Sequence, residues 1–123
     1  MSNVPEHPNI VQSRGLRLRG EEEAGVSFHL MEYAANETLL RYFKTASGRF
    51  REEIVRFYFL QICHAVEHIH LSGFAHLDLK LNNIFLDDYF NIKIGDFGSA
   101  YETKTGRCRH RRGTQNYMAP EVS

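Results

Sequence analysis

One stretch in the second half of the chain decides the fold, because it sets closely spaced polar residues around two short apolar runs. From residue 74 to residue 98 it reads FAHLDLKLNNIFLDDYFNIKIGDFG. The runs Ile84–Leu86 and Ile92–Ile94 flank a polar turn, a pattern that predicts a small β-hairpin with a polar loop at each end. Such a hairpin would hold Asn83 and Asp96 near each other, and oxygen-bearing side chains are the ligands that Mg²⁺ prefers.

Three motifs of the chain follow one another in a known order. They are His76-Leu77-Asp78 with Asn83, then Asp96-Phe97-Gly98, and then Ala119-Pro120-Glu121. In these segments the chain resembles the protein kinase family, whose catalytic loop, metal-binding motif and Ala-Pro-Glu segment have the same order. Lys80 and the run 113–118 are similar to the serine/threonine branch of that family.

The resemblance covers about His7 to Val122 and implies an α+β, protein-kinase-like fold that is truncated at both ends. Residues 1–31 would be a remnant of the small lobe, residues 32–37 the hinge, and residues 38–123 the first half of the mainly helical large lobe. The glycine-rich loop and the phosphate-pairing lysine of a complete kinase would lie upstream of the first residue. Further helices of the large lobe would follow the last one.

The resemblance also implies a role for each polar residue of the site. Asp78 would accept the proton of a Ser or Thr hydroxyl or orient it, and Thr114 would help to hold Asp78. Lys80 would stabilise charge on the transferred phosphoryl group. Asn83 and Asp96 would bind the magnesium ions that bridge the phosphates of ATP.

Adenine recognition is placed by the same resemblance at the hinge and on the hairpin. Met31 would guard the rear of the pocket. The backbone carbonyl of Glu32 and the backbone amide of Ala34 would pair with the adenine edge, since backbone groups are rigid donors and acceptors. Phe85 would cover one face of the ring.

Leu77 departs from the family pattern, which usually has Arg there to pair with a phosphate on the activation segment. His110 stands four residues before Thr114, where related kinases often carry the phosphorylated residue. Both partners of the usual charge pair are therefore replaced. We hypothesise that the activation segment does not use this phosphorylation switch.

Hydrophobic periodicity and capping residues predict the other elements. An alternating strand runs over residues 15–20, and a second strand from Val26 to Tyr33. Thr38 caps a short helix, whose pattern Gly48 breaks. A longer helix over about residues 51–71 ends at Gly73. It presents an apolar stripe of Ile54, Phe57, Tyr58, Ile62, Ala65, Val66 and Ile69.

The charge balance and the cysteine count of the chain indicate which classes of partner and which compartment to expect. The chain has 15 basic and 15 acidic residues, so no overall field favours nucleic acid or a membrane. Its two cysteines form no framework, which fits a reducing compartment, and no targeting signal stands at the start. We expect a protein substrate, no nucleic-acid or membrane partner, and a cytoplasmic or nuclear location. The basic run at residues 107, 109, 111 and 112 is typical of a solvated loop, with a bound phosphate or acidic substrate as the alternative.

Two other functions remain open. The chain could be a catalytically inactive kinase-like module that binds a nucleotide or a protein. A remote alternative is a zinc hydrolase, because His64, Glu67 and His68 match the HxxEH pattern of one class of zinc peptidases. Helical spacing, however, places this motif opposite the apolar stripe, and the sequence offers no strong third ligand.

Overall fold

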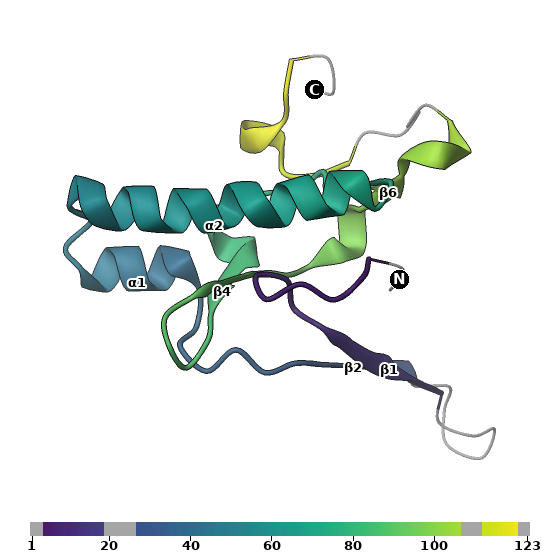
Figure 1. Cartoon of the computed structure of the whole chain (residues 1–123), viewed down its shortest axis with the longest axis horizontal. Helices are drawn as coiled ribbons and strands as arrows, with labels where there is room; N and C mark the ends of the chain where they lie inside the picture. Colours follow the sequence, from purple (N-terminus) through teal and green to yellow (C-terminus); the bar gives the residue numbers. More distant parts are fainter. Residues whose placement is uncertain (1–3, 19–26, 107–111, 121–123) are drawn as a thin grey trace.

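In the part of the chain that the structure describes, the regular elements are two α-helices, three small antiparallel strand pairs and several one-turn 3-10 helices (Figure 1). The computed structural model describes residues 4–18, 27–106 and 112–120. In chain order the helices and strands are β1 (Ser13–Leu18), β2 (Ser27–Met31), α1 (Leu39–Thr45), α2 (Glu52–Leu71), β3 (Phe74–Ala75), β4 (Ile84–Leu86), β5 (Ile92–Ile94) and β6 (Tyr101–Glu102). The mixture of separate helices and antiparallel strands confirms the α+β class.

The helices begin and end where the sequence predicts. Thr38 caps α1, since its side chain accepts a hydrogen bond from the amide of Arg41. Two glutamates occupy the first turn of α2 and two histidines the last, which suits the helix dipole at each end. Gly73 follows α2 with φ of +83°, a left-handed conformation that favours glycine.

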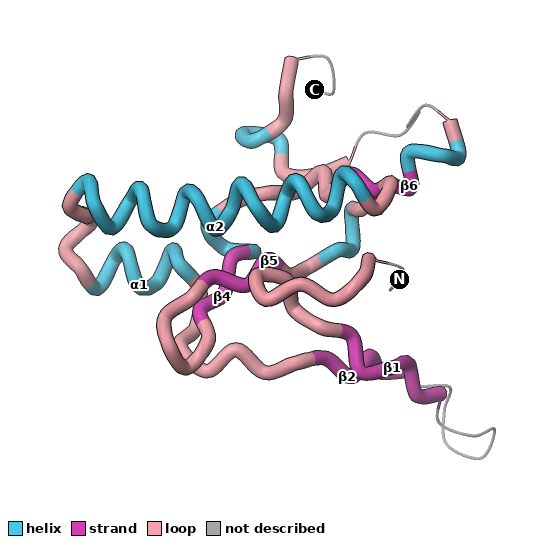
Figure 2. The backbone as a smooth tube through the Cα atoms, viewed as in Figure 1, coloured by secondary structure: helices cyan, strands magenta, loops and turns pink. Residues whose placement is uncertain are grey.

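The predicted hairpin is present and lies at the centre of the molecule, beside α2 (Figure 2). β4 pairs with β5 in the register Ile84 to Ile94, and both strands gain further backbone hydrogen bonds from segments outside the hairpin. The amide of Ile94 donates to Asn9 at 2.8 Å, and the amide of Leu86 donates to Glu37 at 2.9 Å. The hairpin therefore ties the start of the chain to the segment before α1.

The core is a single cluster formed where the hairpin meets the inner face of α2. Its buried members are Ile10, Leu39, Tyr58, Ala65, Ile69, Ile84, Leu86, Ile92 and Ile94. Ile69, Leu86, Ile92 and Ile94 have almost no exposed surface. Because each buried aliphatic side chain contributes about 1.5–3 kcal/mol, this cluster fixes the loops at the ends of the hairpin.

Two details of the predicted elements are wrong. β2 ends at Met31 rather than at Tyr33, because its partner β1 starts at Ser13, opposite Met31. Phe57 does not belong to the buried stripe of α2: it is half exposed, whereas Tyr58 and Ala65 face the core. None of the helices in the described ranges is both long and apolar enough to cross a membrane. The division of the chain into lobes and a hinge stays a prediction.

Candidate active site

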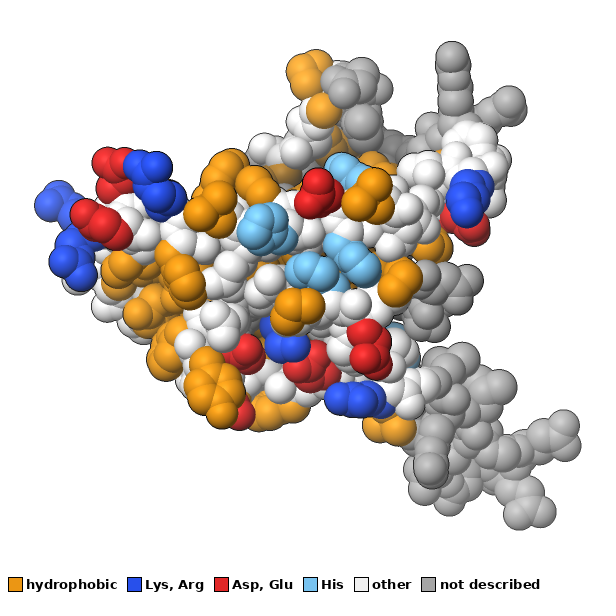
Figure 3. Space-filling view, in the orientation of Figure 1, with side chains coloured by type: hydrophobic (Ala, Val, Ile, Leu, Met, Phe, Trp, Pro, Cys, Tyr) orange, Lys and Arg blue, Asp and Glu red, His pale blue; other side chains and the backbone are white. Residues whose placement is uncertain are grey.

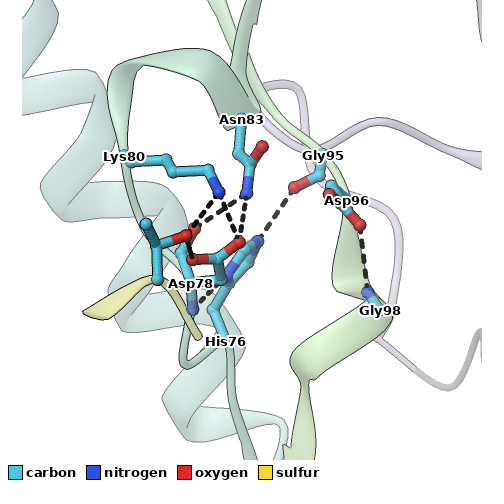
Figure 4. A network of polar contacts seen from close by, with 8 residues as sticks. His76, Asp78, Lys80, Asn83, Gly95, Asp96 and Gly98 are labelled. Carbon is cyan, nitrogen blue, oxygen red and sulfur yellow. Dashed lines mark hydrogen bonds and ion pairs between the residues drawn. The ribbon is translucent and has the colours of Figure 1, made fainter. Parts of the chain in front are cut away.

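The loop before β4 gathers the predicted polar residues around one carboxylate (Figure 4). Thr114 donates from its hydroxyl to Asp78 Oδ1 at 2.6 Å. Lys80 Nζ lies 2.9 Å from Asp78 Oδ2 and also donates to the Thr114 hydroxyl at 2.6 Å. Asn83 donates from its side-chain amide to Asp78 Oδ2 at 3.0 Å and to the Asp78 carbonyl at 2.9 Å. The structure thus brings all four residues predicted to be catalytic into one network.

These contacts control the charge of Asp78. Burial alone raises the pKa of a carboxyl group, because it disfavours the charged form. Here the hydrogen bonds from Thr114, Lys80 and Asn83, with the positive charge of Lys80, outweigh burial and lower the pKa of Asp78 to about 2. The carboxylate is therefore ionised at neutral pH and held in one orientation.

His76 connects this network to the loop after β5. Its Nε2–H donates to the carbonyl of Gly95 at 2.9 Å, and its Nδ1 accepts from the amide of Asp78 at 3.2 Å. This pair of partners fixes a neutral imidazole with the proton on Nε2. Burial lowers the pKa of His76 and so favours the same form, although Gly95, Asp78 and Asp96 oppose the shift. The ring packs on Phe97 with centroids 4.8 Å apart.

Asn83 and Asp96 lie at the open end of the hairpin. The amide of Gly95 donates to the carbonyl of Asn83 at 2.9 Å, and Asp96 follows two residues after the end of β5. Asp96 has a left-handed backbone with φ of 54° and ψ of 69°, and it is exposed. One of its carboxylate oxygens accepts from the amide of Gly98 at 3.3 Å.

The two side chains leave oxygen atoms available. No hydrogen bond among the described residues uses the amide oxygen of Asn83, while every buried side-chain nitrogen or oxygen in the described ranges has a partner. That oxygen therefore keeps some exposed surface, although Asn83 as a whole is buried, with only 5% of its surface exposed. With the exposed carboxylate of Asp96 it forms an all-oxygen donor pair, which suits Mg²⁺ rather than a softer metal.

A cleft of about 1420 Å³ runs from β1 and β2 to the loop after β5. All four residues predicted to hold adenine line it, together with Asp96: they are Met31, Glu32, Ala34 and Phe85. Asp78, Lys80, Asn83 and Thr114 do not line the cleft. Their network lies next to it, joined through Gly95: its carbonyl accepts from His76, and a Cβ added to it would collide with the ring of Phe85.

The backbone groups predicted to meet adenine are unused. No hydrogen bond among the described residues involves the carbonyl of Glu32 or the amide of Ala34. Both residues belong to the segment between β2 and α1, which has no regular structure over most of its length. An edge with one free acceptor and one free donor two residues apart can pair with a heterocycle that offers the complementary pattern.

At Gly113 the chain approaches the loop before β4 closely. A Cβ atom on Gly113 would collide with the carbonyl oxygen of Leu77, and Gly113 has φ of +104°. Only glycine fits at this position, and it places the next residue, Thr114, beside Asp78.

Part of the predicted basic run is used inside the protein. Arg112 donates to the carbonyl of Ala100 at 3.0 Å, and its guanidinium lies 5.9 Å from the centroid of the Tyr101 ring. Arg112 is half-buried, so it matches neither the solvated loop nor a free anion site. The rest of the run, and His110 of the hypothesised missing switch, lie outside the described residues.

The zinc alternative gains no support from the described residues. His64 and Glu67 are exposed, while His68 binds the carbonyl of Pro5 at 3.0 Å and packs on the ring of His7. Histidine side chains gather over α2 in Figure 3. Even so, the described part of the chain has no group of three His, Cys, Asp or Glu side chains placed to hold a metal ion.

Sequence reasoning missed one residue of this region, Lys93. It lies on β5 and is buried, and its ammonium group contacts the carboxylate of Glu32 at 2.6 Å. The available signal was a lysine between two isoleucines in a buried strand, where a charge requires a partner.

Comparison with known proteins gives a consistent result. A family model described as the protein kinase domain matches residues 1–123. The chain is 41% identical over 122 residues to the cell cycle serine/threonine-protein kinase CDC5/MSD2 of Saccharomyces cerevisiae, a match that covers 94% of this chain and 16% of the yeast protein.

Plant kinases are similarly close. The chain is 38% identical over 121 residues to CBL-interacting protein kinase 31 of rice, across 95% of this chain and 26% of the rice protein. It is 42% identical over 97 residues to CBL-interacting serine/threonine-protein kinase 13 of Arabidopsis thaliana, across 76% of this chain and 19% of that protein. The chain thus spans about a quarter or less of the length of these relatives.

Proposed function

The chain belongs to the protein kinase family, and we propose that it forms the part of a serine/threonine kinase site that holds Mg·ATP and orients the acceptor hydroxyl. The observation that carries the proposal is the arrangement around the hairpin. An ionised Asp78 is fixed by three side chains, and oxygen ligands lie at the nearby end of the same strand pair.

Nucleotide binding follows from the cleft. We propose that adenine pairs with the free carbonyl of Glu32 and the free amide of Ala34, with Phe85 against the ring. Met31 would border the pocket behind it. The phosphates would then extend towards Asp96, which lines the same cleft, and towards Asn83 beside it. When bound, Mg²⁺ would neutralise the charge that develops on the transferred group.

Transfer depends on the acceptor oxygen being held in line with the γ-phosphate. Asp78 would accept a hydrogen bond from the substrate hydroxyl and aim it. Its low pKa makes it a weak base, so its main contribution would be orientation, with the proton leaving late. Lys80 is positioned to stabilise charge on the phosphoryl group, and Thr114 fixes the carboxylate.

The proposed substrates are Ser or Thr hydroxyls of proteins, as the names of the relatives indicate for those kinases. We propose a cytoplasmic or nuclear location, with no nucleic-acid or membrane partner, because the balanced charge favours neither. Transfer by this chain alone is part of the test, since an inactive module that holds a nucleotide would share the same cleft.

Asp96→Asn is expected to weaken Mg²⁺-dependent ATP binding by at least about tenfold, because a metal ligand contributes no less than the residues that support it. Isothermal titration of the chain with ATP, with and without Mg²⁺, measures the effect. Asp88→Asn is the matched control: it removes the same charge from an exposed turn residue outside the cleft.

Wild-type chain that binds ATP no better with Mg²⁺ than without it would contradict the proposed metal site. Equal losses in Asp96→Asn and Asp88→Asn would show that overall charge, rather than the position of Asp96, controls binding.

A further inference from the structure

We infer that the partly buried ion pair between Lys93 and Glu32 positions the adenine-binding backbone. The inference rests on the proposed function and adds two positioning residues to it. Lys93 Nζ lies 2.6 Å from Glu32 Oε1, and the two side chains are only 11% and 23% exposed. Sixty residues lie between the partners along the chain, so the contact joins segments that are distant in sequence.

Lys93 is anchored on a strand in the core of the fold. It lies in the middle of β5, between Ile92 and Ile94, which are both fully buried. On the neighbouring strand it is in register with Phe85, the residue proposed to cover the adenine ring. The ammonium group therefore extends from a fixed strand that also carries the ring contact.

Glu32 belongs to a segment without regular secondary structure, which few hydrogen bonds hold in place. Its second carboxylate oxygen accepts from the amide of Gln12 at 3.1 Å, and its own amide donates to the carbonyl of Gln12 at 2.8 Å. After Glu32 the backbone has no regular structure until α1, and its next tie to the hairpin is the amide of Asn36, bonded to Leu86 at 3.0 Å. The unused adenine-facing groups of Glu32 and Ala34 lie between these two anchors.

Stability alone gives a weak reason for this pair. A buried ion pair often adds nothing compared with apolar side chains of the same size, because two charges have to lose their water. The pair has a specific geometric effect, however, because it ties the side chain of Glu32 to β5 next to the backbone that would bind adenine. If the backbone of Glu32 and Ala34 is displaced, its affinity for adenine should fall. The metal ligand Asp96 should not be affected.

The test uses the protein that carries this chain and compares Lys93→Met, Glu32→Gln and the double variant, which leaves no unpaired charge buried. Dissociation constants for Mg·ATP and Mg·GTP are measured for each, with thermal unfolding as a check on folding. We expect each variant to lose roughly tenfold in affinity for ATP, as substitutions in the layer behind a site do. Affinity for GTP should change little, so the preference for ATP shrinks. The double variant should lose no more than the single ones.

A folded double variant that keeps wild-type affinity and preference for ATP would overturn the inference and leave the proposed function standing. So would equal losses for ATP and GTP, which would indicate general destabilisation. Wild-type protein that binds neither nucleotide would instead overturn the proposed function, and this inference with it.

Discussion

Asp78→Asn is expected to lower the rate of phosphoryl transfer by about 10²–10⁴-fold, the range that a positioned acid or base contributes. The amide has the same shape as the carboxylate, and it can still accept hydrogen bonds, but through one oxygen instead of two. It carries no charge, however, and its NH₂ group would face a donor, either the Lys80 ammonium or the Thr114 hydroxyl. The substrate hydroxyl would then no longer be oriented towards the γ-phosphate.

In this variant the rate of phosphoryl transfer should fall while the affinity for Mg·ATP is kept. Asp78 does not line the cleft, so Mg·ATP affinity should stay within about twofold of wild type while the rate at saturating ATP falls. A radiolabel transfer assay with a Ser-containing peptide, run beside the titration, measures both. An Asp78→Asn protein that transfers phosphate at the wild-type rate would contradict the assigned role.

The pH profile tests the same role in another way. The pKa of Asp78 is lowered to about 2, so the carboxylate is ionised throughout the range in which the protein can be assayed. Titration of Asp78 in the free protein should therefore produce no fall in kcat/KM between about pH 5 and pH 8. A step in that range that disappears in Asp78→Asn would mean that the network holds the carboxylate less firmly than its contacts indicate.

Among glycine-to-alanine substitutions in the described residues, we expect Gly113→Ala to reduce stability the most. The added Cβ would collide with the carbonyl of Leu77, which belongs to the backbone and cannot move aside cheaply, and the backbone of Gly113 has φ of +104°. We expect the free energy of unfolding to fall by more than the roughly 1–3 kcal/mol that such a backbone conformation alone costs. Thr114 should also move away from Asp78, so transfer should be lost.

Gly106→Ala provides the matched control. Gly106 has nearly the same φ, +106°, but a Cβ there would meet nothing within 4 Å. Its substitution therefore carries the conformational cost without the collision. Thermal unfolding and the transfer assay should show a clear excess loss in Gly113→Ala. Equal effects of the two substitutions would show that the approach to Leu77 does not matter.

Local pattern predicted much of this molecule. The hairpin, the cap at Thr38 and the end of α2 at Gly73 follow from signals within a few residues of each feature, and all three are confirmed. The network around Asp78 was also within reach, because most of its members lie within five residues and Thr114 belongs to a recognisable motif.

Contacts between residues that are distant in the sequence could not be predicted from local patterns. Nothing near Lys93 in the sequence names Glu32 as its partner, and the early end of β2 depends on where β1 begins. Phe57 matched the helical stripe by spacing, yet it stays half exposed, whereas the neighbouring Tyr58 is buried. Periodicity indicates which face of a helix is apolar, but the neighbouring elements decide how much of it is buried.

The most direct test of the account is the position of the metal. Crystals of the chain grown with Mn²⁺ and a non-hydrolysable ATP analogue would give an anomalous peak that locates the ion without reference to the fold. We predict a peak within about 2.0–2.3 Å of both the Asn83 amide oxygen and the Asp96 carboxylate, with the adenine against Glu32 and Ala34. A peak elsewhere, or nucleotide bound outside the cleft, would contradict it.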